Sequence, residues 1–150
     1  MKKSIKALFI EKMDQLKFHV DRLRSSGLRL TKQRLAISKI LFDRKKTFHF
    51  TIEKLRKITE KESKDQVSIA TLYNTVHAFK EKGYLKEISL KGNKTFFDTN
   101  TTHHHHFYDE DMSQLVDIEN KNISINSLPK TPSGKKIKSV EVLVKIEDAK

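Results

Sequence analysis

Four consecutive histidines, His103 to His106, lie in a lysine-rich chain of 150 residues and have acidic side chains nearby. Neutral imidazole is the commonest metal ligand in proteins, and carboxylates complete a shell of nitrogen and oxygen that suits zinc, manganese or iron(II). The chain has no cysteine, so disulfides, thiolate zinc sites and cysteine nucleophiles are excluded. The run therefore predicts a metal site made of His, Asp and Glu, with haem ligation and a merely solvated strand end as alternatives.

The residues around the histidine run predict a β-strand, whose side chains alternate between two faces. His104 and His106 would then share one face, and His103 and His105 would share the other. A single run could in this way supply ligands to two separate sites. The neighbouring acids that could complete such sites are Asp98, Asp109, Glu110, Asp111 and Asp117.

The N-terminal half must position these ligands, and its pattern is helical. Residues 4–25 carry apolar side chains at helical spacing, and we expect this helix to pack on the body of the protein. Three further helices are preceded by hydroxyl side chains that can cap them: Thr31, Thr51 and Ser68. Residues 84–99 then predict a basic hairpin around the turn "KGN". Helices followed by such a hairpin indicate a winged helix-turn-helix.

The last of these helices has an outward face that is small, polar and nearly uncharged. Its apolar face would consist of Ile69, Leu72, Val76 and Phe79. Its outward residues would be Ala70, Thr71, Asn74 and His77, with Tyr73 on the flank. Such side chains suit base edges in the major groove, and Lys94 in the hairpin would contact phosphates. We therefore expect double-stranded DNA as a partner.

The charge of the chain is unevenly distributed. Residues 1–91 have a net charge of +13, whereas residues 92–150 have a net charge of −1. A basic half favours a polyanion, because neutralised phosphates release counterions. No segment reaches the ~20 apolar residues that a membrane-spanning helix needs. We expect a cytoplasmic protein with no membrane partner.

The C-terminal half predicts a small sheet. Residues 103–111 and 115–119 predict two strands, 123–128 a short helix, and 137–147 a further strand. So small a sheet buries little by itself, so we expect a homodimer, which would also read two half-sites of an operator. The predicted fold class is α+β, with an N-terminal winged helix-turn-helix followed by a small α/β dimerisation domain.

Motifs of common enzymes are absent. There is no His-Glu-x-x-His helix, no Gly-rich phosphate loop and no Gly-x-Ser-x-Gly elbow. We therefore predict that the protein is not an enzyme but a metal-responsive DNA-binding protein. The alternatives are a metal-independent winged-helix DNA-binding protein and a metal-dependent hydrolase.

Several motifs in order resemble the ferric uptake regulator family of bacterial repressors: "LRLTKQRLAI", "VSIATLYNTVHAFKEKGYL", "GNKTFFDTNTTHHHHFYDED" and "QLVDIE". The ending "SLPKTPSGKKIKSVEVLVKI" and the lack of cysteine resemble its iron response regulator branch. The resemblance covers roughly residues 22–147. It implies a repressor of iron-related genes that responds to metal or haem. The implied domains are a DNA-binding domain at 1–97, with an extra helix at 1–21, a hinge at 98–103, and a dimerisation and sensing domain at 104–150.

The resemblance also implies metal ligands. For the sensory site between the domains, the matched positions are His49, Asp98, His105 and Asp117. A further ligand position of the family falls at Phe107, which cannot bind a metal. A second site would begin at His104 and His106, but the later ligands of that site have no counterpart in this chain. Zinc, manganese or iron would be the ion, and the iron response regulator branch implies haem as another ligand.

Overall fold

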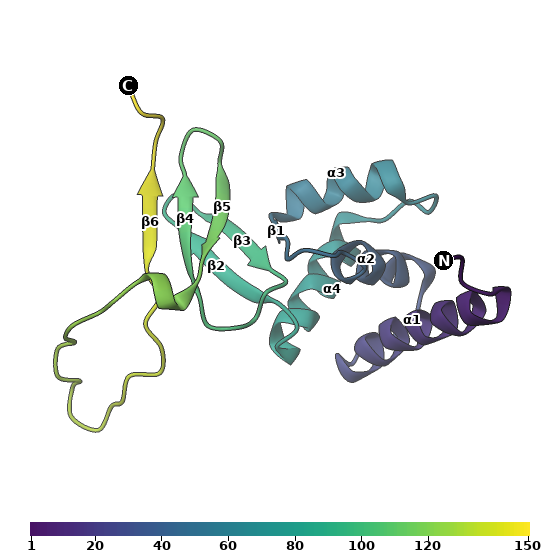
Figure 1. Ribbon diagram of the computed structural model, residues 1–150, viewed down its shortest axis with the longest axis horizontal. Coiled ribbons are helices and arrows are strands. Elements are labelled where there is room, and N and C mark those ends of the chain that lie inside the picture. Colours follow the sequence, from purple (N-terminus) through teal and green to yellow (C-terminus); the bar gives the residue numbers. More distant parts are fainter. The chain divides into compact units, whose positions relative to one another are not determined.

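The computed structural model describes residues 1–150, which form two compact units, residues 1–101 and residues 102–150. We call them the N-terminal unit and the C-terminal unit and describe each by itself. The N-terminal unit has four helices and a three-stranded sheet, whereas the C-terminal unit has a second three-stranded sheet and no α-helix (Figure 1). No helix combines the length and the apolar character needed to cross a membrane.

The N-terminal unit follows the predicted order of helices and hairpin. Its elements are α1 (Ile5–Ser25), α2 (Lys32–Phe42), β1 (His49–Phe50), α3 (Ile52–Glu62), α4 (Ile69–Lys82), β2 (Lys86–Leu90) and β3 (Lys94–Asp98). The side chains of Thr31, Thr51 and Ser68 accept hydrogen bonds from backbone N–H groups in the first turns of α2, α3 and α4. Gly83 ends α4 with a φ of +85°, a conformation that glycine adopts without steric cost.

The core of this unit lies between the helices and the sheet. Its fully buried side chains include Leu23, Ile37, Leu41, Phe50, Leu55, Leu72, Val76 and Phe79. The sheet has the order β1-β3-β2, and the β2–β3 hairpin is the predicted wing. Ile69 is an exception to the expected apolar face of α4, because 51% of it is exposed. It lies in the first turn of α4, where the other core helices no longer cover that face.

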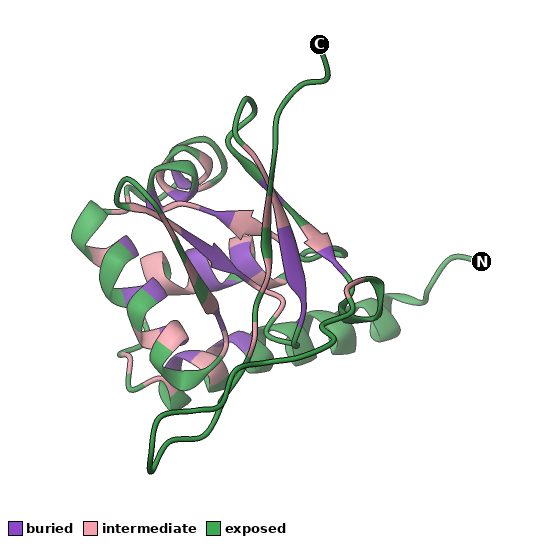
Figure 2. Cartoon of the chain, turned by 90° about the vertical axis from the view of Figure 1, so that its left-hand side faces the viewer, coloured by how far each residue is buried: buried purple, intermediate pink, exposed green.

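Helix α1 packs on the body only through its second half, which corrects the expectation for residues 4–25. Every residue up to Phe18 is exposed, including Phe9 and Met13 of the apolar stripe (Figure 2). The reason is length: at 1.5 Å per residue, α1 is about 32 Å long and α2 about 17 Å. The first half of α1 therefore extends beyond the surface that its second half covers.

His19 on α1 is a buried structural residue. Its Nδ1 lies 2.8 Å from the Ser38 hydroxyl, and its Nε2 lies 2.7 Å from Oδ1 of Asp43. The ring is completely buried, so these two partners satisfy nitrogens that water cannot reach. His19 thus links α1 to α2 at two points, Ser38 within the helix and Asp43 at its C-terminal cap.

The C-terminal unit consists of β4 (His105–Asp109), β5 (Gln114–Ile118), the 3-10 turn η1 (Asn120–Asn122) and β6 (Leu143–Ile146). The sheet order is β5-β4-β6, with β4 antiparallel to β5 and parallel to β6. The helix expected at 123–128 does not form, so this unit is β-rich and not α/β. Ile, Asn and Ser have low helix propensity, and six residues before a proline are too few to nucleate a helix. Strand β6 is also shorter than the expected 137–147.

Candidate metal centre and nucleic-acid interface

The register of β4 against β5 decides which histidines face Asp117. His106 lies directly opposite Asp117, and directly opposed residues of an antiparallel pair point to the same face. His104 precedes His106 by two residues and shares its face. The carboxylate of Asp117 is therefore approached by His104 and His106.

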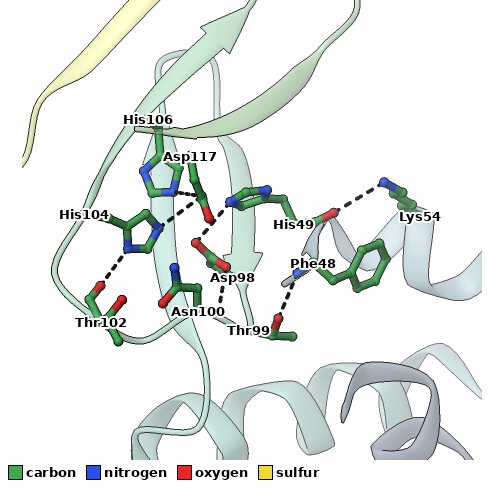
Figure 3. Close-up of polar contacts among 10 residues, drawn as sticks. All are labelled: Phe48, His49, Lys54, Asp98, Thr99, Asn100, Thr102, His104, His106 and Asp117. Carbon is green, nitrogen blue, oxygen red and sulfur yellow. Dashed lines mark hydrogen bonds and ion pairs between the residues drawn. The ribbon is translucent and has the colours of Figure 1, made fainter. Parts of the chain in front are cut away.

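These three side chains form a compact ligand group. Nε2 of His104 and Nε2 of His106 lie 3.2 Å and 3.3 Å from the same oxygen, Oδ1 of Asp117 (Figure 3). All three ligand atoms lie within 4.8 Å of one another, and both imidazoles are buried. Two nitrogens and one carboxylate oxygen thus converge on one point.

The carbonyl of Thr102 determines which nitrogen of His104 is available. That oxygen lies 2.7 Å from Nδ1, and because a carbonyl only accepts hydrogen bonds, Nδ1 must carry the proton. The Nε2 of a neutral His104 then presents its lone pair to the negatively charged oxygen of Asp117. Such an arrangement requires a cation, either a proton or a metal ion, between the two atoms. A carbonyl that fixes the tautomer of a ligating histidine is a usual feature of metal sites.

The N-terminal unit carries a second pair of ligands. His49 on β1 lies opposite Asp98 on β3, and its Nε2 is 3.1 Å from Oδ2 of Asp98 (Figure 3). The other oxygen of Asp98 accepts a hydrogen bond of 2.7 Å from the backbone N–H of Asn100. Asp98 is completely buried, so its charge has a large desolvation cost unless cationic partners offset it.

The distances within each group fit a bound ion. Ligand atoms at about 2.1 Å from a metal are separated by about 3.0 Å at a right angle and about 3.4 Å at the tetrahedral angle. The three measured nitrogen–oxygen distances, 3.1, 3.2 and 3.3 Å, lie within this interval. The donors are imidazole and carboxylate only, a set suited to zinc, manganese or iron(II). The residues present therefore fit a divalent metal.

His105 does not face Asp117, contrary to the sequence-based expectation. Its Nδ1 accepts a hydrogen bond of 3.0 Å from the backbone N–H of Val142, so the proton lies on Nε2, which is 3.0 Å from Oδ1 of Asn120. Both nitrogens are engaged, and the ring has no lone pair for a metal. His103 lies on the same face, 2.9 Å from the carbonyl of Val140. His104 and His106, expected in a second site, are instead the partners of Asp117.

Three residues of this region could not be identified from sequence alone. Thr102 acts through its backbone carbonyl, which carries no signature of residue type. Asn120 and Val142 meet His105 only because β5 and β6 flank β4. Phe107, half-buried, lies on the strand face of His105 and not on that of the ligands.

Helix α4 presents the expected outward face in the N-terminal unit. Ala70, Tyr73, Asn74 and His77 are exposed, whereas Thr71 is half-buried and its hydroxyl lies 2.9 Å from that of Ser68. The rings of Tyr73 and His77 stack with centroids 6.1 Å apart, and His77 meets Phe97 edge-on at 6.0 Å. Stacking restricts the rotamers of both rings, so less entropy is lost when a partner binds. Lys94 lies at the start of β3, with Nζ 6.0 Å from the Phe96 ring.

Comparison with known proteins identifies the family. A model of the ferric uptake regulator family matches residues 25–146. The peroxide-responsive repressor PerR of Staphylococcus aureus is 30% identical over 105 residues, which are 70% of this chain and 69% of the repressor. This chain belongs to the ferric uptake regulator family. The match begins at the end of α1 and includes α4, the wing and both ligand groups.

Solved structures share the fold. The ferric uptake regulator from Pseudomonas aeruginosa with manganese has a TM-score of 0.63 and 19% identity, covering 88% of this chain and 98% of that one. The ferric uptake regulator from Francisella tularensis with iron has a TM-score of 0.65 and 16% identity, covering 81% and 92%. The α+β fold class, with a helical DNA-binding part and a small β-rich part, is thus confirmed.

As a member of the ferric uptake regulator family, the chain is a DNA-binding transcription regulator that responds to metal. It is not an enzyme. The family membership therefore excludes the metal-dependent hydrolase considered from the sequence.

Proposed function

We propose that this ferric uptake regulator family member is an operator-binding repressor whose divalent ion is held by His49, Asp98, His104, His106 and Asp117 together. The observation that carries the proposal is the convergence of two imidazole nitrogens on one oxygen of Asp117, at 3.2 and 3.3 Å. The pair of His49 and Asp98 supplies the same donor types from the N-terminal unit. In this proposal His104 and His106 take the place of His105 in the ligand set that the resemblance implied.

Chain connectivity supports joint binding. Only five residues separate Asp98 from His104, so the two groups are held at high effective concentration relative to each other. Each group alone offers two or three protein ligands, fewer than the four to six that zinc, manganese or iron usually take. An ion that completes its shell therefore gains from ligands of both units. The metals named for related proteins, manganese and iron, agree with these donors.

Joint binding would couple the metal to DNA. The ion would favour orientations of the N-terminal unit in which both groups reach it, and so shift the population of dimer conformations. Thermodynamic reciprocity then requires DNA to change the affinity for metal by the same factor as metal changes the affinity for DNA. His49 has the central place, because β1 leads directly into α3 of the DNA-binding unit.

The proposed DNA contacts are made by the outward residues of α4 and by the wing. In this proposal α4 enters the major groove, where Asn74 and its neighbours Ala70, Thr71, Tyr73 and His77 meet base edges. Lys94 and the wing contact phosphates. The basic N-terminal part of the chain supports this, since its net charge of +13 over residues 1–91 favours a polyanion.

The assembly we propose is a homodimer formed by the C-terminal unit in the cytoplasm, where the operator is found. Its sheet has exposed apolar side chains, with Val116 at 51%, Leu143 at 38% and Ile146 at 37% exposure. Strands β5 and β6 are edges of the sheet and have unpaired backbone groups on one side. Pairing with a second copy would satisfy these groups and cover the apolar side chains.

A finer assignment is the iron response regulator branch, with iron-related target genes. It rests on the ending "SLPKTPSGKKIKSVEVLVKI" and on the absence of cysteine. That branch implies haem as a ligand. Titration of the protein with haemin, followed by its absorption spectrum, distinguishes haem binding from binding of the metal ion alone.

The proposal is tested by measuring operator binding with manganese and with a chelator. The affinity of the wild type should differ between the two conditions, and His49→Ala should remove the difference while leaving the circular dichroism spectrum unchanged. His103→Ala is the control, because it removes an exposed histidine that belongs neither to the ligand groups nor to the DNA-contacting residues, so its difference between the two conditions should persist. Operator binding that is equal with manganese and with chelator would instead support a metal-independent DNA-binding protein.

A further inference from the structure

The charges of the C-terminal unit are unevenly distributed between the two ends of its sheet. Strand β4 ends, β5 begins and β6 ends at the same end, because β4 is antiparallel to β5 and parallel to β6. Five acids gather there: Asp109, Glu110, Asp111, Glu147 and Asp148. Contacts keep them together, with Glu110 3.0 Å from Lys145 and Asp111 2.7 Å from the backbone N–H of Asp148.

The opposite end carries residues 119–142, which connect β5 to β6 (Figure 1). We call residues 120–140 of this connection the basic loop. The basic loop has five lysines, and its flanking residues Glu119 and Glu141 are the acids of the connection. Lys121 is paired with Glu119 at 2.7 Å, whereas the other four lysines form no ion pair. Those four are exposed: Lys130, Lys135, Lys136 and Lys138.

A closed turn lies between Lys130 and the other three lysines of the basic loop. The backbone N–H of Lys135 donates to the carbonyl of Pro132 at 3.0 Å, and the hydroxyl of Thr131 donates to the carbonyl of Lys135 at 2.8 Å. Gly134 has a φ of +73°, which lets the chain reverse. The turn places Lys130 on one side and Lys135, Lys136 and Lys138 on the other.

Exposed like charges that are close in the chain and form no ion pair repel one another, and a polyanion relieves that repulsion. We infer that the basic loop is a second DNA-contacting element, which binds backbone phosphates in addition to the contacts of α4 and the wing. The inference rests on the proposed function, since it needs an operator-bound protein. It assigns DNA contacts to the unit otherwise regarded as sensing and dimerising.

The position of the basic loop within its unit favours DNA over an acidic protein. The chain enters the C-terminal unit at Thr102, just before β4, and therefore at the end of the sheet that carries the basic loop. This end is tethered to the DNA-binding unit, so bound DNA is present at high effective concentration. The acidic end lies at the opposite ends of the strands, away from the point where the chain enters this unit.

The inference is tested with two double variants of the full chain that change the net charge equally. Lys135→Gln with Lys136→Gln alters the basic loop, and Lys145→Gln with Lys150→Gln alters the acidic end of the same unit. Operator affinity is measured over a series of salt concentrations. The slope of log K against log salt is negative, and each lost phosphate contact reduces its magnitude by about 0.9. The magnitude should therefore fall by up to about 1.8 per chain in the first variant. The second variant should keep the wild-type slope.

The loss should be equal for operator and unrelated duplexes, and Lys135→Arg with Lys136→Arg should retain the wild-type slope because arginine keeps the charge. If the wild type binds its operator and the slope of the Gln variant is unchanged, the inference is refuted but the proposed function is not. An acidic protein would then be the favoured partner of the basic loop. Equal losses in the two Gln variants also overturn it, because net charge would explain both. A wild type that binds no duplex refutes the proposed function instead.

Discussion

The assignment of ligands within the histidine run can be tested by two adjacent substitutions, His104→Ala and His105→Ala. The structure gives these neighbours opposite roles. His104 directs Nε2 at Asp117, whereas both nitrogens of His105 bond to Asn120 and Val142. His104 should therefore matter for metal binding, and His105 for the stability of the metal-free protein.

The magnitudes follow from the contacts. A metal present at a hundred times its dissociation constant stabilises the folded state by about 2.7 kcal/mol. For a chain of this length each kcal/mol moves Tm by about 2–4 °C, so manganese should raise the Tm of the wild type by roughly 5–11 °C. His105→Ala removes two hydrogen bonds at about 1 kcal/mol each, which lowers the metal-free Tm by roughly 4–8 °C.

The assay is thermal unfolding followed by circular dichroism, in chelator and in excess manganese. The increment caused by manganese should persist in His105→Ala, despite its lower starting Tm, and should largely disappear in His104→Ala. The increment and the starting value are separate readouts, so general destabilisation does not imitate loss of a ligand. The reasoning is refuted if His105→Ala loses the increment and His104→Ala keeps it.

Three further predictions concern the N-terminal unit. Asn74→Ala should relax base preference by about 1–3 kcal/mol at the bases it contacts, whereas Lys94→Ala should weaken binding to all duplexes alike; binding to a panel of single-base operator variants separates the two effects. His19→Ala should lower the free energy of unfolding by about 2 kcal/mol, measured in urea, because the buried hydroxyl of Ser38 loses its partner; no change would mean that α1 is not fastened by this ring. Gly83→Ala should cost about 1–2 kcal/mol in the same assay, because φ there is +85° and no neighbour is within reach of the added methyl group, so the cost is conformational; Gly83→Asn should cost less.

Local features of the N-terminal unit could be predicted well because their causes are local. A hydroxyl before an apolar periodic run identified the starts of α2, α3 and α4, since the capping bond joins residues three apart. Gly83 ends α4 for a similarly local reason, since its positive φ needs no distant partner. The outward face of α4 followed from helical geometry, except where the core no longer covers Ile69.

Features that depend on distant partners could not be predicted in this way. The sequence contains the apolar stripe of α1 but not the length of the surface that receives it, so the overhanging first half was unexpected. His19 has no local sign of burial, because Ser38 and Asp43 come 19 and 24 residues later. The basic loop has a readable composition, but its place opposite the acidic end depends on strand directions.

The histidine run shows most clearly the difference between what local sequence determines and what distant partners determine. Its composition determined by itself that the chain offers imidazole and carboxylate ligands, and strand alternation determined that His104 pairs with His106 and His103 with His105. Which pair faces Asp117 was decided only by the register of β4 against β5, which places His106 opposite that carboxylate. A shift of one residue would exchange the faces, because side chains alternate with a period of two. Register is fixed by the packing of whole strands, so no local pattern in the run could reveal it.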